Sequence, residues 1–317
     1  MHRQRDFLLL ATLAAAAATP ALGQNADPGA RAASTAPQST ASAPDLSRLW
    51  ANTLGPGLPQ PASGPGPVVS KLRRPNGTPI FSATGDHTNP ILTPPAAEIV
   101  KKKADMEVDG AAFPNPHNQC WPEPTPFTLS IQFGMQIIQQ KDEVLLLYPS
   151  DHQVRRVHMN VPHSERPTLS WQGESVGRYE GGTLVVDTIG QKVGPLSMVD
   201  RFGTPFSSAL HVIERYRLID GEMARDLQRR HVSEYFPAGS PFRNPYGLGD
   251  IDPDTSKPGL QAEITVDDPI MFTSPWSALV TYRQALGKWP EAVCAENTRG
   301  SGSTWVVLTP QAANPDF

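Results

Sequence analysis

Residues 171–188 read WQGESVGRYEGGTLVVDT, and this stretch decides the fold. Gly181-Gly182 is the signal of a two-residue hairpin turn, because both turn positions need a positive φ, which glycine adopts without steric cost. The β-branched run at 183–188 predicts a strand that returns antiparallel to the extended residues 168–179. The stretch therefore predicts a β-hairpin.

The same stretch contains Gly173-Glu174-Ser175-Val176-Gly177, a literal G-x-S-x-G. In α/β-hydrolases this pattern holds a nucleophilic serine on a strand-to-helix turn, where the helix N-terminus helps to bind the oxyanion. Three glycines and then a β-branched run follow Ser175 within a few residues, so no helix can begin there. We interpret Ser175 as a strand residue among glycines that let the strand bend.

Strand signals continue on both sides of the hairpin. Alternating or β-branched patterns predict strands over residues 127–137, 143–148, 154–159, 210–218, 261–266 and 277–282. Asp220-Gly221 predicts a second hairpin turn, and Ala, Glu and Lys predict one helix over 95–106. Short strands at close intervals predict a mainly β fold, an antiparallel barrel (lipocalin-like) or a sandwich, with long loops and one or two short helices.

The N-terminal region predicts export. A basic start, an apolar run and small residues at 21 and 23 predict a signal peptide over residues 1–23, cleaved near Gly23-Gln24. Ala, Pro, Gly and Ser then make up 27 of the 45 residues 24–68, which predicts a disordered tether. Within this tether, residues 45–50 are the one segment that can dock as the first edge of the fold. Residues 69–317 are expected to form a single β-rich domain in the periplasm or outside the cell.

Charge and hydropathy narrow the range of partners. A formal net charge of -4 gives no support for a nucleic-acid partner. After the N-terminal run, no stretch approaches the roughly 20 apolar residues that a membrane span needs. No redox, phosphate or nucleotide motif is present, so neither an organic cofactor nor a metal is expected.

Two cysteines, Cys120 and Cys294, stand at opposite ends of the predicted domain. In an oxidising compartment such a pair favours a disulfide. The alternatives, a metal ligand or a nucleophilic thiol, lack support, because neither cysteine lies in a C-x-x-C motif and His117 is the only histidine near Cys120.

Around the opening stretch the chain resembles a large family of secreted bacterial proteins with the pattern W-x-G-x-S-[IV]-G-[RK]-[WY]-E-G-[DG]-T-L-V-V-[DE]-T. The matching residues are Trp171, Gly173, Ser175, Gly177, Arg178, Tyr179, Glu180, Gly181, Thr183, Leu184, Val185, Val186, Asp187 and Thr188. Weaker matches extend over most of residues 120–297. The chain departs from the family at 160–164, where it keeps only His163, and at Phe206-Ser207. The resemblance implies kinship and export, and it carries no particular activity.

Histidine is the residue type best suited to proton transfer at neutral pH, so the candidate catalytic residues are chosen around the histidines. His158 and His163 lie in a histidine-rich stretch, and His211 lies on the polar face of its predicted strand. The spacings fit no zinc site. We therefore expect His163 or His158 to act as base or acid with His211 as partner, Arg178 to hold an anionic group, and Asp187 to assist.

Aromatic and charged residues on the predicted strands are candidates for ligand binding. They are Trp171, Tyr179, Glu180, Arg215 and Trp276. Each also has an ordinary interpretation, as a core aromatic or as a member of a surface ion pair. The leading hypothesis is an exported, cofactor-independent lyase, isomerase or cyclase acting on a small apolar or aromatic metabolite. The alternatives are a periplasmic binding protein for a small hydrophobic ligand and a structural or envelope-interaction protein.

Overall fold

The computed structural model describes residues 43–52, 57–73, 75, 77, 83–131, 134–235, 251–287 and 293–294. The expected signal peptide and residues 24–42 of the expected tether lie outside this range. Residues 45–50, expected to dock as the first edge of the fold, do so: Leu46 and Trp50 are buried in the core and β1 begins at Leu49. Residues 57–68 were assigned to the tether, but Leu58 and Val68 are also buried in the core. The composition of this region is dominated by Pro, Gly and Ala, so a count of residue types does not reveal these few apolar side chains.

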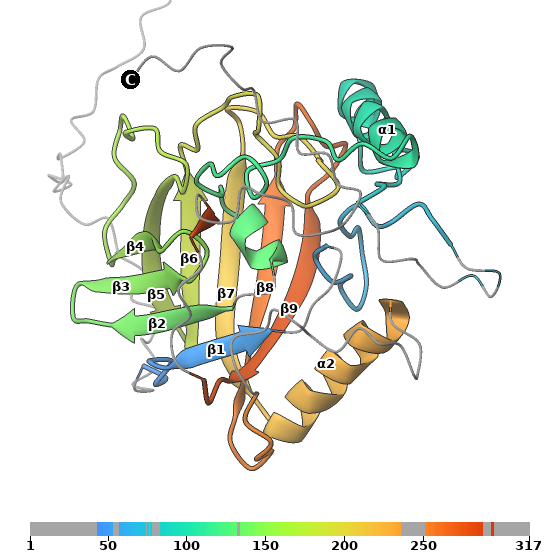
Figure 1. Cartoon of the computed structure of the whole chain (residues 1–317). Helices are drawn as coiled ribbons and strands as arrows, with labels where there is room; N and C mark the ends of the chain where they lie inside the picture. Colours follow the sequence, from blue (N-terminus) through green and yellow to red (C-terminus); the bar gives the residue numbers. More distant parts are fainter. Residues whose placement is uncertain are drawn as a thin grey trace, which may run out of the picture. The chain divides into compact units, whose positions relative to one another are not determined.

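The described strands close into a nine-stranded barrel (Figure 1), which confirms the predicted fold class. Neighbours in sequence pair throughout, and the first strand also pairs with the last. Every pair is antiparallel except the fourth and fifth strands, which are parallel. The strands are β1 (Leu49–Asn52), β2 (Met135–Gln139), β3 (Glu143–Tyr148), β4 (Gln153–Met159), β5 (Glu174–Glu180), β6 (Thr183–Ile189), β7 (His211–Ile219), β8 (Gly259–Asp267) and β9 (Trp276–Gln284).

The hairpin of the opening stretch is confirmed. Glu180 of β5 pairs with Thr183 of β6. The turn residues Gly181 and Gly182 have φ angles of 52° and 85°, the left-handed region that only glycine enters freely. Ser175 lies inside β5 and no helix follows it, as the glycine pattern predicts.

Two helices flank the barrel, and one of them was missed. The helix α1 (Pro94–Val108) confirms the predicted helix. The helix α2 (Gly221–Tyr235) begins where a second hairpin turn was predicted, so that prediction is wrong. Asp220 caps the helix, since its Oδ1 accepts a hydrogen bond from the backbone N–H of Met223 at 2.9 Å. An Asp-Gly pair is compatible with both a turn and a helix start, and the residues after it decide.

The predicted strand over 127–137 is also partly wrong. Residues Phe127–Ser130 form the short 3-10 helix η1, and the strand β2 begins only at Met135. All four residues of η1 are buried. Because η1 has no solvent face, its alternation of apolar and polar residues does not report a strand with one buried side.

The parallel pair β4–β5 requires a crossover, formed by residues 160–173. This segment contains no helix and carries two exposed apolar side chains, Val161 and Leu169. It returns the chain to the start of β5, where Ser170 makes a parallel bridge with Gln191.

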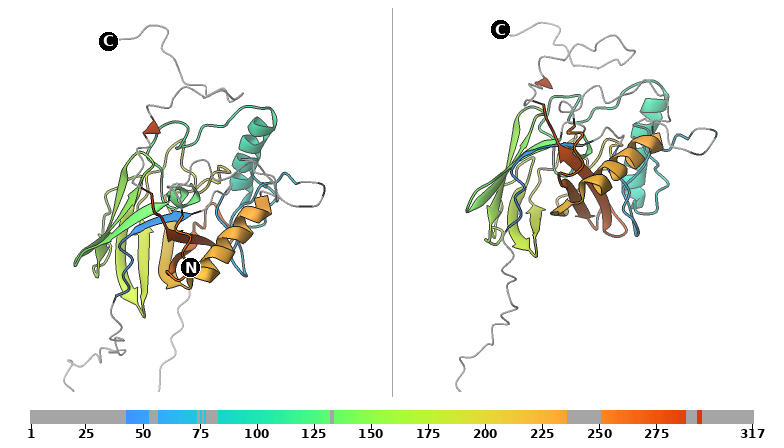
Figure 2. Two further views of the ribbon diagram at one scale, coloured as in Figure 1. Left: turned by 60° about the horizontal axis from the view of Figure 1, so that its bottom comes forward. Right: turned by 90° about the horizontal axis from the view of Figure 1, so that it is seen from below.

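The barrel interior is filled with large side chains and one buried ion pair. Arg155 on β4 and Glu214 on β7 are about 1% and 0% exposed and contact each other directly. The helix α2 packs outside the barrel, against β8 and β9, as the second view in Figure 2 shows from below. The largest buried side chains include Trp50, Trp276, Arg155, Tyr148, Tyr216 and Tyr282.

Candidate functional site

Three of the five predicted catalytic residues meet on the outer face of the barrel. His163, in the crossover, places Nδ1 3.1 Å from Glu174 Oε1 and Nε2 3.0 Å from Asp187 Oδ1. His211 Nε2 lies 2.8 Å from the same Asp187 oxygen. We call these four residues the histidine chain. Glu174, Asp187 and His211 point outward because their strand neighbours fill the barrel interior.

Hydrogen bonds lower the pKa of both carboxyl groups in the histidine chain. Burial acts to raise the pKa of Asp187, but the hydrogen bonds from His163 and His211 outweigh it and hold the pKa below its ordinary value. The hydroxyl of Ser164 donates to Glu174 and lowers the pKa of that carboxyl as well. His163 lies between the two carboxylates, with one ring nitrogen facing each of them.

The other two predicted catalytic residues, His158 and Arg178, lie apart from the histidine chain. His158 is exposed on the outer face of β4. Arg178 forms an exposed ion pair with Glu180 at 2.6 Å, so its guanidinium already has an anionic partner. Both fall on the strand faces that alternation predicts, but neither completes a shared site with His163.

The predicted ligand-binding residues are not gathered around one cavity. Trp276 is 1% exposed and packs edge-on against Phe272 inside the barrel, so it is a core residue. Tyr179 accepts a hydrogen bond from Gln139 at 2.6 Å, and Glu180 pairs with Arg178. Arg215 is half-buried on β7. None of these is among the described residues that line the cavity presented below.

Trp171 instead lies within the crossover and takes part in an aromatic contact. Its ring centroid lies 5.1 Å from that of Trp121 in an edge-on arrangement. Lys192 places Nζ 5.6 Å from the Trp171 ring centroid, a cation–π contact. This group is a rim contact and not the wall of a described cavity.

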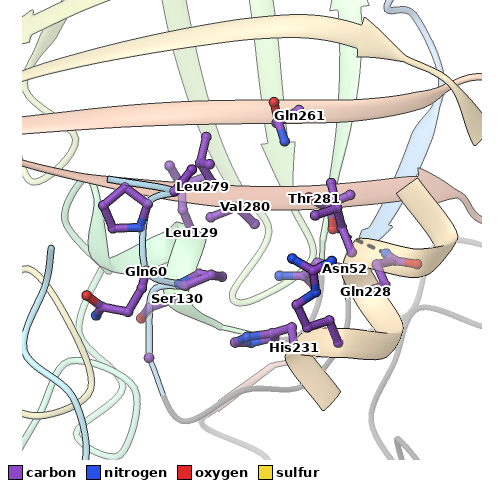
Figure 3. Close-up of a pocket in the computed structure, with 16 residues that line it drawn as sticks. Asn52, Gln60, Leu129, Ser130, Gln228, His231, Gln261, Leu279, Val280 and Thr281 are labelled. Atoms are coloured by element: carbon purple, nitrogen blue, oxygen red, sulfur yellow. Dashed lines mark hydrogen bonds between the residues drawn. The ribbon is translucent and has the colours of Figure 1, made fainter. Parts of the chain in front are cut away.

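A cavity of about 350 Å³ is lined by α2, the strands β1, β8 and β9, and the helix η1 (Figure 3). The loop at 57–62 also lines it. Its described lining residues are Asn52, Gly57, Pro59, Gln60, Pro61, Ala62, Leu129, Ser130, Leu227, Gln228, Arg230, His231, Gln261, Leu279, Val280 and Thr281. Sequence reasoning missed this site, because it assigned 57–62 to the tether and did not predict α2.

The helix α2 is fixed to the barrel at this cavity by one glutamine. Gln228 is 4% exposed, and its Nε2 donates to the backbone oxygens of Ala51 and Thr281, each at 3.2 Å. Both amide protons are thus committed to backbone carbonyls on β1 and β9. These two hydrogen bonds hold α2, which forms one wall of the cavity, against the barrel.

Among the described residues that line the cavity, the side chains that can carry a charge are Arg230 and His231. Burial lowers the pKa of His231 to about 4, so this imidazole is neutral near pH 7. Arg230 is exposed at the rim. The described lining includes no aspartate or glutamate. The cavity therefore suits a neutral or anionic ligand and offers no counter-charge to a cation.

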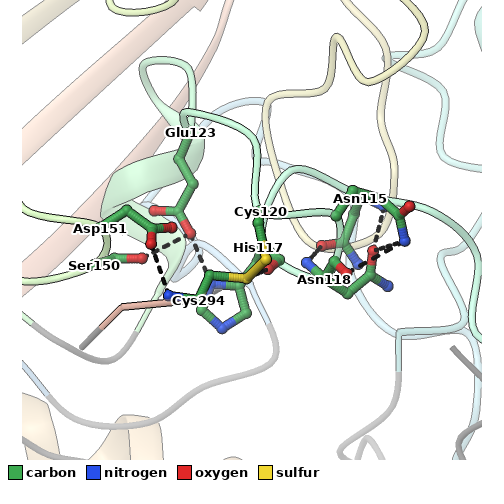
Figure 4. Close-up of a disulfide and its surroundings, with 9 residues drawn as sticks. Asn115, His117, Asn118, Cys120, Glu123, Ser150, Asp151 and Cys294 are labelled. Carbon is green, nitrogen blue, oxygen red and sulfur yellow. Dashed lines mark hydrogen bonds and ion pairs between the residues drawn. A yellow bond between two sulfur atoms is a disulfide. The ribbon is translucent and has the colours of Figure 1, made fainter. Parts of the chain in front are cut away.

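The predicted disulfide is present (Figure 4). Cys120 and Cys294 are bonded with Cα atoms 5.3 Å apart, and the backbone N–H of Cys294 donates to Asp151 at 2.7 Å. Beside it, the fully buried Glu123 accepts from Ser150 and lies 2.7 Å from His117 Nδ1. The disulfide thus anchors the segment after β9 to the loops at one end of the barrel.

Within the described ranges, no group of three or more His, Cys, Asp or Glu is arranged to hold a metal ion. In the same residues, no helix combines the length and apolar character that crossing a membrane requires.

Comparisons with models of known families, with curated proteins and with solved structures found no match for this chain. Its function therefore has to be inferred from the cavity and the histidine chain.

Proposed function

We propose that the protein binds a small molecule in the cavity lined by α2, β1, β8, β9 and η1. The observation that carries this proposal is the cavity itself. Its volume of about 350 Å³ falls within the range of natural small-ligand pockets. Leu129, Leu279 and Val280 supply apolar surface, and amide and hydroxyl groups supply polar contacts. His231, with its lowered pKa, adds a perturbed titratable group, a common feature of functional sites.

Binding without turnover fits the cavity better than catalysis within it. Acid–base catalysis needs a proton donor and acceptor that converge on the reacting atoms. The described lining holds one histidine and no carboxylate. We therefore favour the binding protein over the enzyme at this cavity.

A ligand screen by thermal shift on the purified full chain tests this proposal. The variant Leu279→Trp places a larger side chain in the cavity and should weaken binding of each hit by at least about tenfold. Ile270→Trp, at an exposed position outside the cavity lining, is the matched control and should leave binding unchanged. Hits that bind Leu279→Trp as tightly as the unmodified protein would refute the cavity as the site.

We also propose a second function for the histidine chain, because a specific arrangement favours it. Two histidines share one carboxylate, which is suited to acid–base catalysis on a small apolar or aromatic metabolite, as in a lyase, isomerase or cyclase. His211, 39% exposed, is the member most open to a substrate. Mass spectrometry of screened metabolites checks this: His211→Gln should abolish any turnover, and His158→Gln should not. Turnover that survives His211→Gln would reject this role.

The remaining proposal concerns location. The basic and apolar N-terminal pattern, and the resemblance to secreted proteins, support cleavage near Gly23-Gln24 and a periplasmic or secreted protein. N-terminal sequencing of the protein recovered from the periplasm tests this, and an intact Met1 would contradict it. If no small molecule binds, the structural or envelope-interaction function becomes the leading alternative.

A further inference from the structure

One buried polar atom at the cavity has no hydrogen-bond partner. Asn52 is 6% exposed and lines the cavity, and its Oδ1 makes no hydrogen bond. Its Nδ2 donates to the backbone oxygen of Ile131 at 3.0 Å. A carbonyl oxygen can only accept, so this bond fixes which end of the amide carries the oxygen. Leaving a buried acceptor unmatched is unfavourable, and a ligand that donates to it removes that cost.

A second acceptor faces the same cavity. Ser130 is 5% exposed, and its hydroxyl donates to the backbone oxygen of Phe127 at 2.7 Å. With the proton committed there, Ser130 Oγ offers only lone pairs to a ligand. The short helix η1 holds both ends of this bond, so the orientation of the hydroxyl is set by the fold.

Gln228 of α2 does not add a third acceptor. Both its amide protons are directed to backbone carbonyls, and Figure 3 shows its amide oxygen turned away from the other labelled lining residues. The acceptors that the cavity offers are thus Asn52 Oδ1, which has no partner, and Ser130 Oγ, whose proton is used by the protein.

The charge of the lining restricts which hydrogen-bond donor group the ligand can carry. An ammonium group is a strong donor, but the described lining has no carboxylate to pair with it, and Arg230 stands at the rim. A hydroxyl group donates without carrying charge. The apolar side chains of Leu129 and Leu279 offer a surface for an apolar part of the ligand.

We infer that the cavity takes a neutral hydroxylated molecule with an apolar body, an alcohol or phenol whose hydroxyl groups donate to Asn52 Oδ1 and Ser130 Oγ. This inference rests on the proposed binding function and specifies its ligand class.

Matched probes test it on the full chain, with calorimetry as the readout. The series is a naphthalenediol, its dimethyl ether, which keeps the oxygens but loses both donors, and the bis(aminomethyl) analogue, which is cationic. We expect the diol to bind at least about tenfold more tightly than the ether, the value of one well-placed hydrogen bond. The cationic analogue should bind no more tightly than the ether.

The variant Asn52→Ala assigns the effect to its acceptor. It should reduce the preference for the diol over the ether, while Ile270→Trp should keep the full preference. If Asn52→Ala does not fold, the probe series on the unmodified protein still decides the question. Equal binding of diol and ether, or tightest binding of the cation, would overturn the ligand class and leave the cavity in place. Loss of all cavity binding, with no hit sensitive to Leu279→Trp, would overturn the proposed function and this inference with it.

Discussion

Arg155 is the residue whose environment departs most from expectation for its type. Its side chain is 1% exposed, and it pairs with Glu214, with Ser175 Oγ at 2.9 Å and with Thr188 Oγ1 at 2.6 Å. Burial opposes its charge, but the attraction of Glu214 outweighs burial and holds the pKa of Arg155 above its ordinary value. Ser175, the serine of the G-x-S-x-G pattern, is therefore a hydrogen-bond acceptor in the core.

Removing Arg155 should destabilise the barrel strongly. Arg155→Met leaves Glu214 buried without its counter-charge, which costs about 3–5 kcal/mol. Arg156→Met is the matched control, because Arg156 is the next residue, is 65% exposed, and lies 3.4 Å from Glu143 at the surface. The control should cost at most about 1 kcal/mol. Urea unfolding measures both, and equal losses would show that the buried pair is not stabilised as described.

His231 should make stability depend on pH. Its pKa is about 4 in the folded chain, against an ordinary value of 6.5. As the pH falls from about 6.5 to 4, the unfolded chain takes up this proton before the folded chain does, so the unfolding free energy should decrease. The loss is at most about 3 kcal/mol at pH 4. His231→Phe should remove this part of the slope in urea unfolding at several pH values, and an unchanged slope would contradict the burial of this imidazole.

At the scale of elements, the crossover at 160–173 is held mainly by polar contacts. His163 bonds Glu174 and Asp187, and Ser164 donates to Glu174 from both its backbone and its hydroxyl. The exposed Val161 and Leu169 contribute little apolar burial. The polar contacts thus secure the one connection in the barrel that a parallel strand pair requires.

His163→Ala should loosen this crossover while leaving the barrel intact. Hydrogen exchange over residues 160–173 should become faster, and exchange in the core strands should stay unchanged. His158→Ala, on the exposed face of β4, is the control. The pKa of Asp187 is lowered in the folded chain, so its contribution is present above about pH 4 and is lost as the pH falls through the lowered pKa. Unchanged exchange in His163→Ala would show that the crossover is held by other contacts.

The elements that the sequence predicts correctly are those with one buried face. The residues of β3, β4 and β6 alternate or are β-branched, and the prediction matches the structure within one residue or two. The failures have a shared cause. All residues of η1 are buried, so its sequence pattern does not distinguish a buried face from an exposed one. The Asp-Gly pair at 220–221 was interpreted as a hairpin turn, but Asp220 caps the start of α2.

At the scale of the whole molecule, the two candidate sites were predictable to different degrees. His163 and His211 were singled out because histidine is the residue type suited to proton transfer at neutral pH, and Asp187 was named with them as an assisting carboxylate. The cavity is built from segments around residues 52, 57–62, 129–130, 227–231, 261 and 279–281. No local pattern links these segments, since only closure of the barrel and docking of α2 bring them together.

The disulfide joins two parts of the described fold that are far apart in sequence. Cys120 and Cys294 are 174 residues apart in sequence, so the cross-link restricts the unfolded chain over most of the domain. In the chain-entropy model so long a loop contributes up to ~5 kcal/mol, and losses of about 2–5 kcal/mol are typical. Cys120→Ser and Cys294→Ser should each lower the unfolding free energy by a similar amount. The double variant should lose no more than either single variant, because both remove the same bond. Urea unfolding of all three under oxidising conditions measures this, and additive losses would show that each cysteine stabilises the fold through contacts of its own.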